Sequence, residues 1–123
     1  MSSIFDFIDY RKFLSAYYSA QKKNNRHFSY RYFALKAGIS SPSFLKLVID
    51  GKRNLTEPAI EKFITAMKLN KKEAAYFHNL VLFNQAKTAV AKQEHYAVLR
   101  TMAGTVKESV LNGNLFDYFS EWY

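Results

Sequence analysis

The residues with the clearest chemical potential lie in one stretch, ISSPSFLKLVIDGKRN at residues 39–54. It begins with the hydroxyl-bearing side chains Ser41 and Ser43, and it ends with the adjacent cations Lys52 and Arg53. Hydroxyl groups donate hydrogen bonds to phosphate oxygens, and lysine and arginine neutralise phosphate charge. The stretch therefore predicts either a helix that meets a polyanion such as nucleic acid, or a core helix that ends in a basic loop.

Positive charge is concentrated in the same third of the chain. The 123 residues include 18 Lys or Arg and 10 Asp or Glu, which gives a net charge of +8. Residues 11–53 hold ten of the cations and one acid, Asp50, whereas the other eighty residues hold eight cations and nine acids. Such asymmetry predicts a polyanionic partner, and the alternative is a basic surface that serves only solubility.

A helix is expected over residues 39–51, with Gly51 as its stop. Ser41 is the expected N-cap, because a serine followed by a proline is typical of a first helical turn. On a helical wheel the apolar side chains fill one broad arc that must be mostly buried. The narrow remaining arc is the only one offered to solvent, and it holds Pro42, Ser43, Lys46 and Asp50.

Each polar residue of this helix has two interpretations. Lys46 is the best candidate for a phosphate or groove contact, but it can also pair with Asp50 one turn away. The two serines can cap the helix or meet a duplex, and Lys52 and Arg53 can grip phosphate or complement the helix dipole. The exposed arc contains no Arg, Asn or Gln, so base-specific readout through it is expected to be weak. Contacts to the nucleic-acid backbone and readout of its shape, aided by Arg31, Arg26 and Lys22/Lys23, would then supply more of the binding.

Apolar residues at helical spacing extend along almost the whole chain. They predict an all-α fold, a bundle of five to six helices that contains a helix-turn-helix at about residues 29–51. We divide the chain into a helix-turn-helix domain, residues 1–87, and a connecting helix with an aromatic tail, residues 88–123. The tail ends in LFDYFSEWY, and we expect it to dock or dimerise, or else to fold back on its own core. Helix starts are expected at Asp9, Ser29, Thr56 and Asn70, and helix stops at Gly38 and Gly51.

Several classes of site lack support in the sequence. There is no cysteine, which excludes disulfides and thiolate metal ligands. The three histidines are far apart and the four glycines are scattered, so we predict no metal, no cofactor, no small-molecule ligand and no enzyme activity. The N-terminus has acids where a signal peptide has cations, and no apolar run approaches the ~20 residues that span a bilayer. We therefore expect a cytoplasmic protein without membrane contact.

The motifs AGIS…F…GKRN…T…AIEKFITAMKLN resemble the repressor-type helix-turn-helix domain, the xenobiotic-response-element-like family, over about residues 29–69. In that family the recognition helix ends in a glycine followed by basic residues and a short loop. The resemblance implies that Lys52 and Arg53 clamp phosphate from this loop. Gly51 lies one residue further from Gly38 than is usual in the family, so the register of the recognition helix does not carry over.

A second resemblance covers nearly the whole chain. The segments DYRKFL, SSPSFLKLVIDGKRNLT, LNKKEAAYFHNLVLFNQAKT and YFSEWY are similar to the Fibrobacter paralogous family. Members of this bacterial family join an N-terminal domain of this kind to a larger C-terminal domain. The segment similar to YFSEWY leads into that second domain, so we expect the present chain to be either truncated or a natural short form.

Together these observations predict the DNA-binding domain of a bacterial transcriptional regulator. Helix 39–51 is expected to enter the major groove, and a homodimer through residues 88–123 would set two half-sites about 34 Å apart. The alternatives are a protein-interaction module derived from the helix-turn-helix fold, and RNA binding in which aromatic side chains stack on single-stranded bases. The predicted contacts with duplex DNA are those of Arg31, Ser41, Ser43, Lys46, Lys52 and Arg53.

Overall fold

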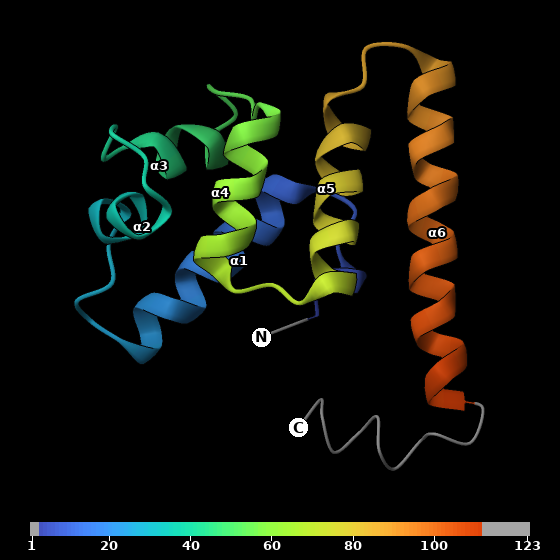
Figure 1. The fold of residues 1–123 in the computed structure, drawn as a ribbon, viewed down its shortest axis with the longest axis horizontal. Coiled ribbons are helices and arrows are strands. Elements are labelled where there is room, and N and C mark those ends of the chain that lie inside the picture. The colour runs from blue at the N-terminus through green and yellow to red at the C-terminus, as the bar shows by residue number, and fades with distance from the viewer. Residues whose placement is uncertain (1–2, 112–123) are drawn as a thin grey trace.

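The chain is helical from near its N-terminus to residue 111. The computed structural model describes the backbone of residues 3–111 and the side chains of residues 3–104. Within that part of the chain there are six α-helices, one short 3-10 helix and no strand, so the predicted all-α bundle is confirmed (Figure 1). In chain order the elements are η1 (Ile4–Asp6), α1 (Tyr10–Asn24), α2 (Tyr30–Ala37), α3 (Phe44–Ile49), α4 (Glu57–Met67), α5 (Lys71–Gln85) and α6 (Ala89–Leu111).

Four of the first five α-helices begin where a short polar side chain caps them. Asp9 caps α1, Ser29 caps α2 and Thr56 caps α4, each by accepting hydrogen bonds from backbone N–H groups of the first turn. At α5, Asn70 and Glu73 form a reciprocal capping box, with N–O distances of 2.8 and 2.9 Å. These four predicted starts are confirmed. Each cap joins residues at most three positions apart, so the local sequence is sufficient to predict it.

Three helices end at a residue with left-handed backbone conformation. Gly38 ends α2 with a φ of 72°, and Gly51 follows α3 with a φ of 81°. Both are predicted stops, and glycine adopts this conformation without steric cost. The end of α4 is different, because Lys68 has a φ of 56° although it carries a Cβ. For such a residue the left-handed conformation costs about 1–2 kcal/mol.

Replacing Lys68 with glycine is expected to stabilise the protein. Lys68→Gly removes the Cβ, while the N–H groups of residues 68 and 69 keep their bonds to the carbonyl oxygens of Thr65 and Ile64. We expect the free energy of unfolding to rise by about 0.5–1 kcal/mol, since the freedom of glycine in the unfolded chain offsets part of the gain. Urea denaturation measures this change. An unchanged or lower midpoint in the variant would contradict it.

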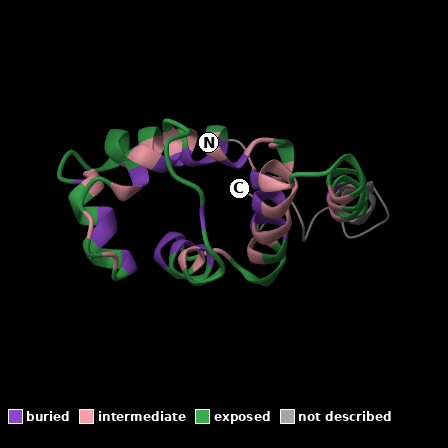
Figure 2. Cartoon of the chain, turned by 90° about the horizontal axis from the view of Figure 1, so that it is seen from above, coloured by how far each residue is buried: buried purple, intermediate pink, exposed green. Residues whose placement is uncertain are grey.

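The core is a continuous layer of aromatic and aliphatic side chains. Phe33 of α2 meets Phe63 of α4 edge to face, with ring centroids 5.0 Å apart, and Phe13 of α1 packs on Phe77 of α5. In Figure 2 the buried sides of the helices face the interior of the bundle. No polar or charged residue is buried among residues 3–104. The largest fully buried side chains are Tyr10, Phe13, Phe28, Phe33, Phe63, Phe77, Leu14, Leu45, Ile60, Leu80, Leu99 and Val48.

Two amide side chains at the end of α5 join segments that are far apart in the sequence. Asn84 accepts a hydrogen bond from the N–H of Tyr10 (2.7 Å) and donates one to the carbonyl of Ile8 (3.0 Å). Gln85 accepts from the Tyr10 hydroxyl and from the N–H of Leu55, both at 2.8 Å, and donates to the Leu55 carbonyl at 3.0 Å. The start of α1 and the loop before α4 are thereby fixed to α5.

Tyr10 is expected to make the fold sensitive to alkaline pH. Its side chain is fully buried, and burial raises the pKa of its hydroxyl from 10.0 to about 12. The unfolded chain releases this proton at lower pH than the folded chain does. The stabilisation is therefore complete below pH 10 and is lost as the pH rises from about 10 to about 12. In this interval the free energy of unfolding should fall by at most about 1.4 kcal/mol per pH unit.

Urea unfolding at pH 9, 10 and 11 measures this loss, with Tyr10→Phe as the comparison. The variant should have a lower midpoint at pH 9, because Gln85 loses the hydroxyl that donates to it. Above pH 10 its stability should decline less steeply than that of the wild type. Some decline remains, because burial also raises the pKa values of Tyr17, Tyr30 and Tyr76. Equal slopes in the two proteins would show that Tyr10 does not cause the effect.

α6 lies alongside α5 at one edge of the bundle and also contacts η1 (Figure 1). Leu99 is the buried residue of its packed face, and Met102 and Ala103 lie against the core from the same helix.

Among residues 3–111 no helix is both long and apolar enough to cross a membrane. The aromatic tail lies outside the described residues, and so does the docking or dimerisation predicted for it. The division into residues 1–87 and 88–123 stays a prediction.

Candidate nucleic-acid interface

α2 and α3 are joined by a turn at residues 38–43. Gly38 allows the chain to reverse, and the N–H groups of Gly38 and Ile39 bond to the carbonyls of Leu35 (3.3 Å) and Ala34 (2.8 Å). Ile39 then packs against the core, which holds the turn against the bundle. α3 contacts both α1 and α2. The predicted helix-turn-helix is therefore present as two short helices in contact.

α3 starts later and is shorter than predicted. It spans Phe44–Ile49 rather than residues 39–51, and the prediction that Ser41 is its N-cap is wrong. The carbonyl of Ser41 instead accepts a bond from the N–H of the first helical residue (3.3 Å), which closes a turn with Pro42 at its second position. Ser43 occupies the N-cap position without a side-chain hydrogen bond, because its φ of −98° and ψ of 5° lie outside the extended region from which serine caps.

Lys46 projects from the exposed face of α3 and pairs with Asp50, with 3.0 Å between Nζ and Oδ2. The hydrogen bond and the negative charge of Asp50 raise the pKa of Lys46 above its usual value. The intrahelical pair, one of the two interpretations of Lys46, is thus present. Asp50 is the only acid between residues 11 and 53, so this pair leaves the other cations without an acidic partner inside that segment.

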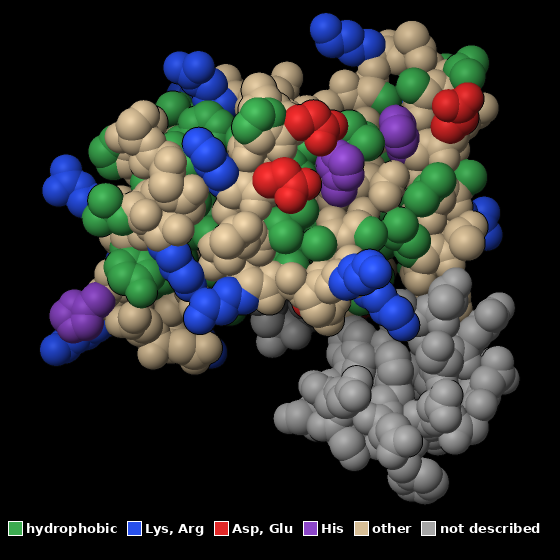
Figure 3. All heavy atoms as spheres, in the orientation of Figure 1, with side chains coloured by type: hydrophobic (Ala, Val, Ile, Leu, Met, Phe, Trp, Pro, Cys, Tyr) green, Lys and Arg blue, Asp and Glu red, His purple; other side chains and the backbone are tan. Residues whose placement is uncertain are grey.

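Most of these cations make no hydrogen bond or ion pair within the described part of the chain. Lys22 is an exception, since its Nζ donates to the carbonyl of Phe28 at 2.8 Å. In Figure 3 the end of the molecule that carries α2 and α3, at the left, shows Lys and Arg side chains and no acidic one on the visible face. Seven side chains between residues 11 and 53 are exposed and make no hydrogen bond or ion pair within the described part of the chain: Lys12, Lys23, Arg26, Arg31, Lys36, Lys52 and Arg53.

Lys52 and Arg53 lie in the loop that leaves α3. The N–H of Gly51 bonds to the carbonyl of Val48 at 3.1 Å, and that of Lys52 bonds to the carbonyl of Leu47 at 2.9 Å. This pair of bonds is a Schellman motif, and it fixes the backbone at the helix end. The side chains of Lys52 and Arg53 remain exposed. They are placed both to complement the dipole of α3 and to reach an external phosphate.

Arg11 of α1 holds this loop in place through hydrogen bonds, although no sequence pattern predicts these contacts. Its guanidinium donates to the backbone carbonyls of Val48 and of Arg53, the latter at 2.9 Å. It also donates to the side-chain oxygen of Asn54 at 2.8 Å, and it lies 4.8 Å from the ring centroid of Tyr10. The acceptors follow Arg11 by 37 to 43 positions, so the contact depends on the tertiary fold.

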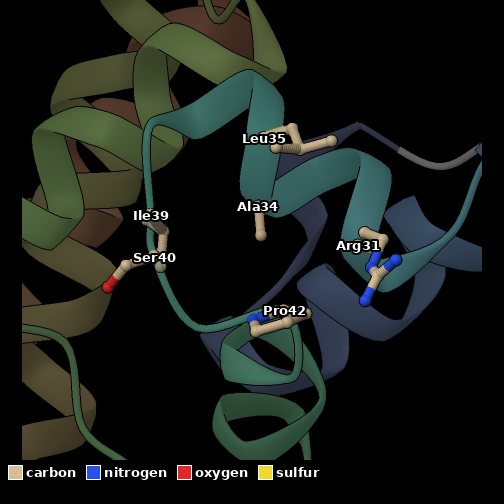
Figure 4. A pocket seen from close by; sticks show the side chains of 6 residues that line it. All are labelled: Arg31, Ala34, Leu35, Ile39, Ser40 and Pro42. Carbon is tan, nitrogen blue, oxygen red and sulfur yellow. The ribbon is translucent and has the colours of Figure 1, made fainter.

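An open hollow of about 200 Å³ lies between α2 and the turn before α3. Figure 4 shows Arg31 on one side of it and the turn residues Ile39 and Ser40 on the other, with Pro42 between them. Leu35 also lines the hollow, and its side chain is 75% exposed. Arg31 is therefore brought to the turn that carries the predicted serines. The other predicted cations lie within α3 or beyond its C-terminal end.

The aromatic side chains of the basic segment pack mainly on one another. Tyr17 and Phe33 are buried in the core. The rings of Tyr18 and Tyr30 stack on each other, with centroids 4.1 Å apart and planes 5° apart. Tyr32 is 44% exposed, and its ring also contacts Phe28. Base stacking by these residues would therefore require most of them to leave existing contacts.

No family model matches the chain, and no curated protein or solved structure matches it. The two resemblances found in the sequence therefore stay predictions.

Among the described residues no group of three or more His, Asp or Glu is placed to hold a metal ion. His78 of α5 lies 2.8 Å from a carboxylate oxygen of Glu57, which makes a pair between α4 and α5. Function is therefore inferred from the charges and contacts of α2, α3 and the loop after α3.

Proposed function

We propose that this chain is the DNA-binding domain of a bacterial transcriptional regulator and binds duplex DNA through α2, α3 and their loops. One observation carries the proposal: seven exposed cations between residues 11 and 53 have no partner in the described part of the chain, and the single acid there is paired with Lys46. A surface of this kind binds a polyanion by displacing its condensed counterions, and it needs no base-specific group to do so.

In this proposal α3 and the turn before it approach the major groove. Arg31 and the hydroxyls of Ser41 and Ser43 meet the duplex at the leading end of α3, and Lys52 and Arg53 hold phosphates beyond its other end. Six residues of helix are only about 9 Å long, and their exposed side offers no Arg, Asn or Gln. Backbone contacts should therefore supply most of the affinity, with weak base preference. Lys46, already paired, adds at most one further phosphate contact.

Fluorescence anisotropy with two labelled probes tests this proposal. A random-sequence duplex of about 20 base pairs and a single strand of the same length are titrated with the protein at about 50 mM salt. We expect the duplex to bind with a dissociation constant in the micromolar range and the single strand to bind more weakly. Preference for the single strand would instead favour RNA-type binding by aromatic side chains. Absence of binding to both probes by folded protein would reject the proposal.

A protein-docking surface is the second candidate, and the exposure of Leu35 favours it. An apolar side chain that is 75% exposed at the rim of a hollow with Pro42 and Ile39 is suited to contact another protein. In that case the basic surface would meet an acidic protein rather than DNA. Reversal of the charges at Lys52 and Arg53 separates the two candidates, because it should weaken DNA binding strongly and leave any association through Leu35 intact.

A homodimer through residues 88–123 is part of the main proposal. In the described part of that segment, Val90 is 66% exposed and Val98 is 40% exposed on α6, which leaves apolar surface for a second copy. Two copies would present two half-sites to DNA about 34 Å apart. Light scattering measures the molar mass, and a dimer should give twice the 14.3 kDa of the chain. A monomer at every concentration would exclude the dimer and leave the DNA proposal standing.

A further inference from the structure

The loop of residues 51–54 is held from two directions. On the α3 side, the N–H groups of Gly51, Lys52 and Arg53 bond to carbonyls of the helix. On the α4 side, Leu55 is held by the amide of Gln85. Between these two anchors, the carbonyl of Arg53 and the side-chain oxygen of Asn54 each accept a hydrogen bond from Arg11.

Arg11 is suited to hold these groups together. A guanidinium presents its N–H donors in a fixed plane, and here one nitrogen meets two backbone carbonyls while a second nitrogen meets Asn54. A lysine ammonium in the same place would keep the charge but would lack this rigid arrangement of donors. Within the described residues no carboxylate forms an ion pair with Arg11, so its positive charge next to the loop is not neutralised.

We propose that Arg11 is a positioning residue, which holds the 51–54 loop in the conformation that presents Lys52 and Arg53 to a phosphate backbone. This inference rests on the proposed function, because it assigns Arg11 a part in the same DNA contact. Arg11 itself acts through the loop, since both of its terminal nitrogens, Nη1 and Nη2, already donate to protein acceptors. Removal of the Arg11 side chain should therefore weaken DNA binding only when Lys52 and Arg53 are present to bind phosphate.

The test is a double-mutant cycle on the full chain, with the random-sequence duplex as the probe at 0.1 M salt. Arg11→Met and Arg11→Lys are each made in the wild type and in a background that carries Lys52→Gln and Arg53→Gln. In the wild type we expect both changes to weaken binding about tenfold, which corresponds to the loss of about one phosphate contact. In the neutralised background the same changes should weaken binding less than about twofold.

Circular dichroism confirms that each variant is folded at the temperature of measurement. Because loss of Arg11 can also lower stability, Asn54→Ala serves as a milder variant that removes one acceptor at an exposed position. It should weaken wild-type binding about threefold and leave binding in the neutralised background unchanged.

Three results would overturn the inference. Equal losses in both backgrounds would mean that Arg11 acts as an independent charge. Binding by Arg11→Lys at the wild-type level would mean that charge alone suffices. Failure of the folded wild-type protein to bind the duplex would reject the proposed function and this inference with it. The first two results would leave the proposed function in place.

Discussion

Duplex binding is expected to fall by about 100-fold at 0.1 M salt when Lys52 and Arg53 are both changed to glutamate. Each phosphate that is neutralised contributes about tenfold at this salt, through release of a counterion. Both side chains are exposed and have no partner in the described part of the chain, so the change removes two phosphate contacts and breaks no internal hydrogen bond or ion pair. The slope of binding against the logarithm of salt should decrease by about two.

Lys71→Glu with Lys72→Glu is the matched control for this prediction. These adjacent lysines lie exposed in the first turn of α5, and the double change alters the net charge by the same amount. Acids in a first turn interact favourably with the helix dipole, so the control should fold. We expect only a few-fold loss of binding, because charges beyond about 10 Å are largely screened at 0.1 M salt. Equal losses in the two variants would show that binding follows net charge and not the loop.

Replacing Gln85 with leucine should lower the free energy of unfolding by about 2–4 kcal/mol. Leucine can fill a similar space, but it leaves the Tyr10 hydroxyl and the N–H and carbonyl groups of Leu55 without their partner. Tyr10 and Leu55 are both buried, and an unpaired buried polar group costs about 1–3 kcal/mol. Chemical denaturation monitored by circular dichroism measures the loss.

Gln93→Leu is the control for this effect. Gln93 is exposed on α6 and its side chain makes no hydrogen bond in the described part of the chain. Its replacement should change the free energy of unfolding by less than about 0.5 kcal/mol. Similar losses in the two variants would contradict a specific role for the Gln85 amide.

The parts of the fold that sequence patterns predict well are those set by residues close to one another in the sequence. The cap at Asp9 and the capping box of Asn70 and Glu73 are local hydrogen bonds, and the stop at Gly51 depends on the backbone freedom of one residue. The start of α3 was predicted too early for the same reason. Ser41 followed by Pro42 suits a first helical turn, but it suits an isolated turn equally well, and the chain forms the latter.

The contacts that organise the candidate site lie beyond such patterns. Arg11 reaches acceptors 37 to 43 positions later, and Gln85 reaches Tyr10 across 75 positions. Neither residue belongs to a motif that marks its partner. The exposure of Leu35 is likewise decided by the angle at which α2 packs, because an apolar residue in a helix is equally compatible with the core. Charge clustering and the possible pairing of Lys46 with Asp50 could be read from the sequence, but the contacts of Arg11 with the loop could not.

The salt dependence of duplex binding tests the central claim most directly. The measurement is an anisotropy titration of the random-sequence duplex at about 50 and 200 mM salt, with circular dichroism to show that the protein is folded at both. Neutralisation of four or five phosphates by the free cations of residues 11–53 predicts a dissociation constant that rises about 100-fold or more between the two conditions. A dissociation constant that does not change with salt, or no binding at 50 mM, would contradict the assignment of this surface to DNA.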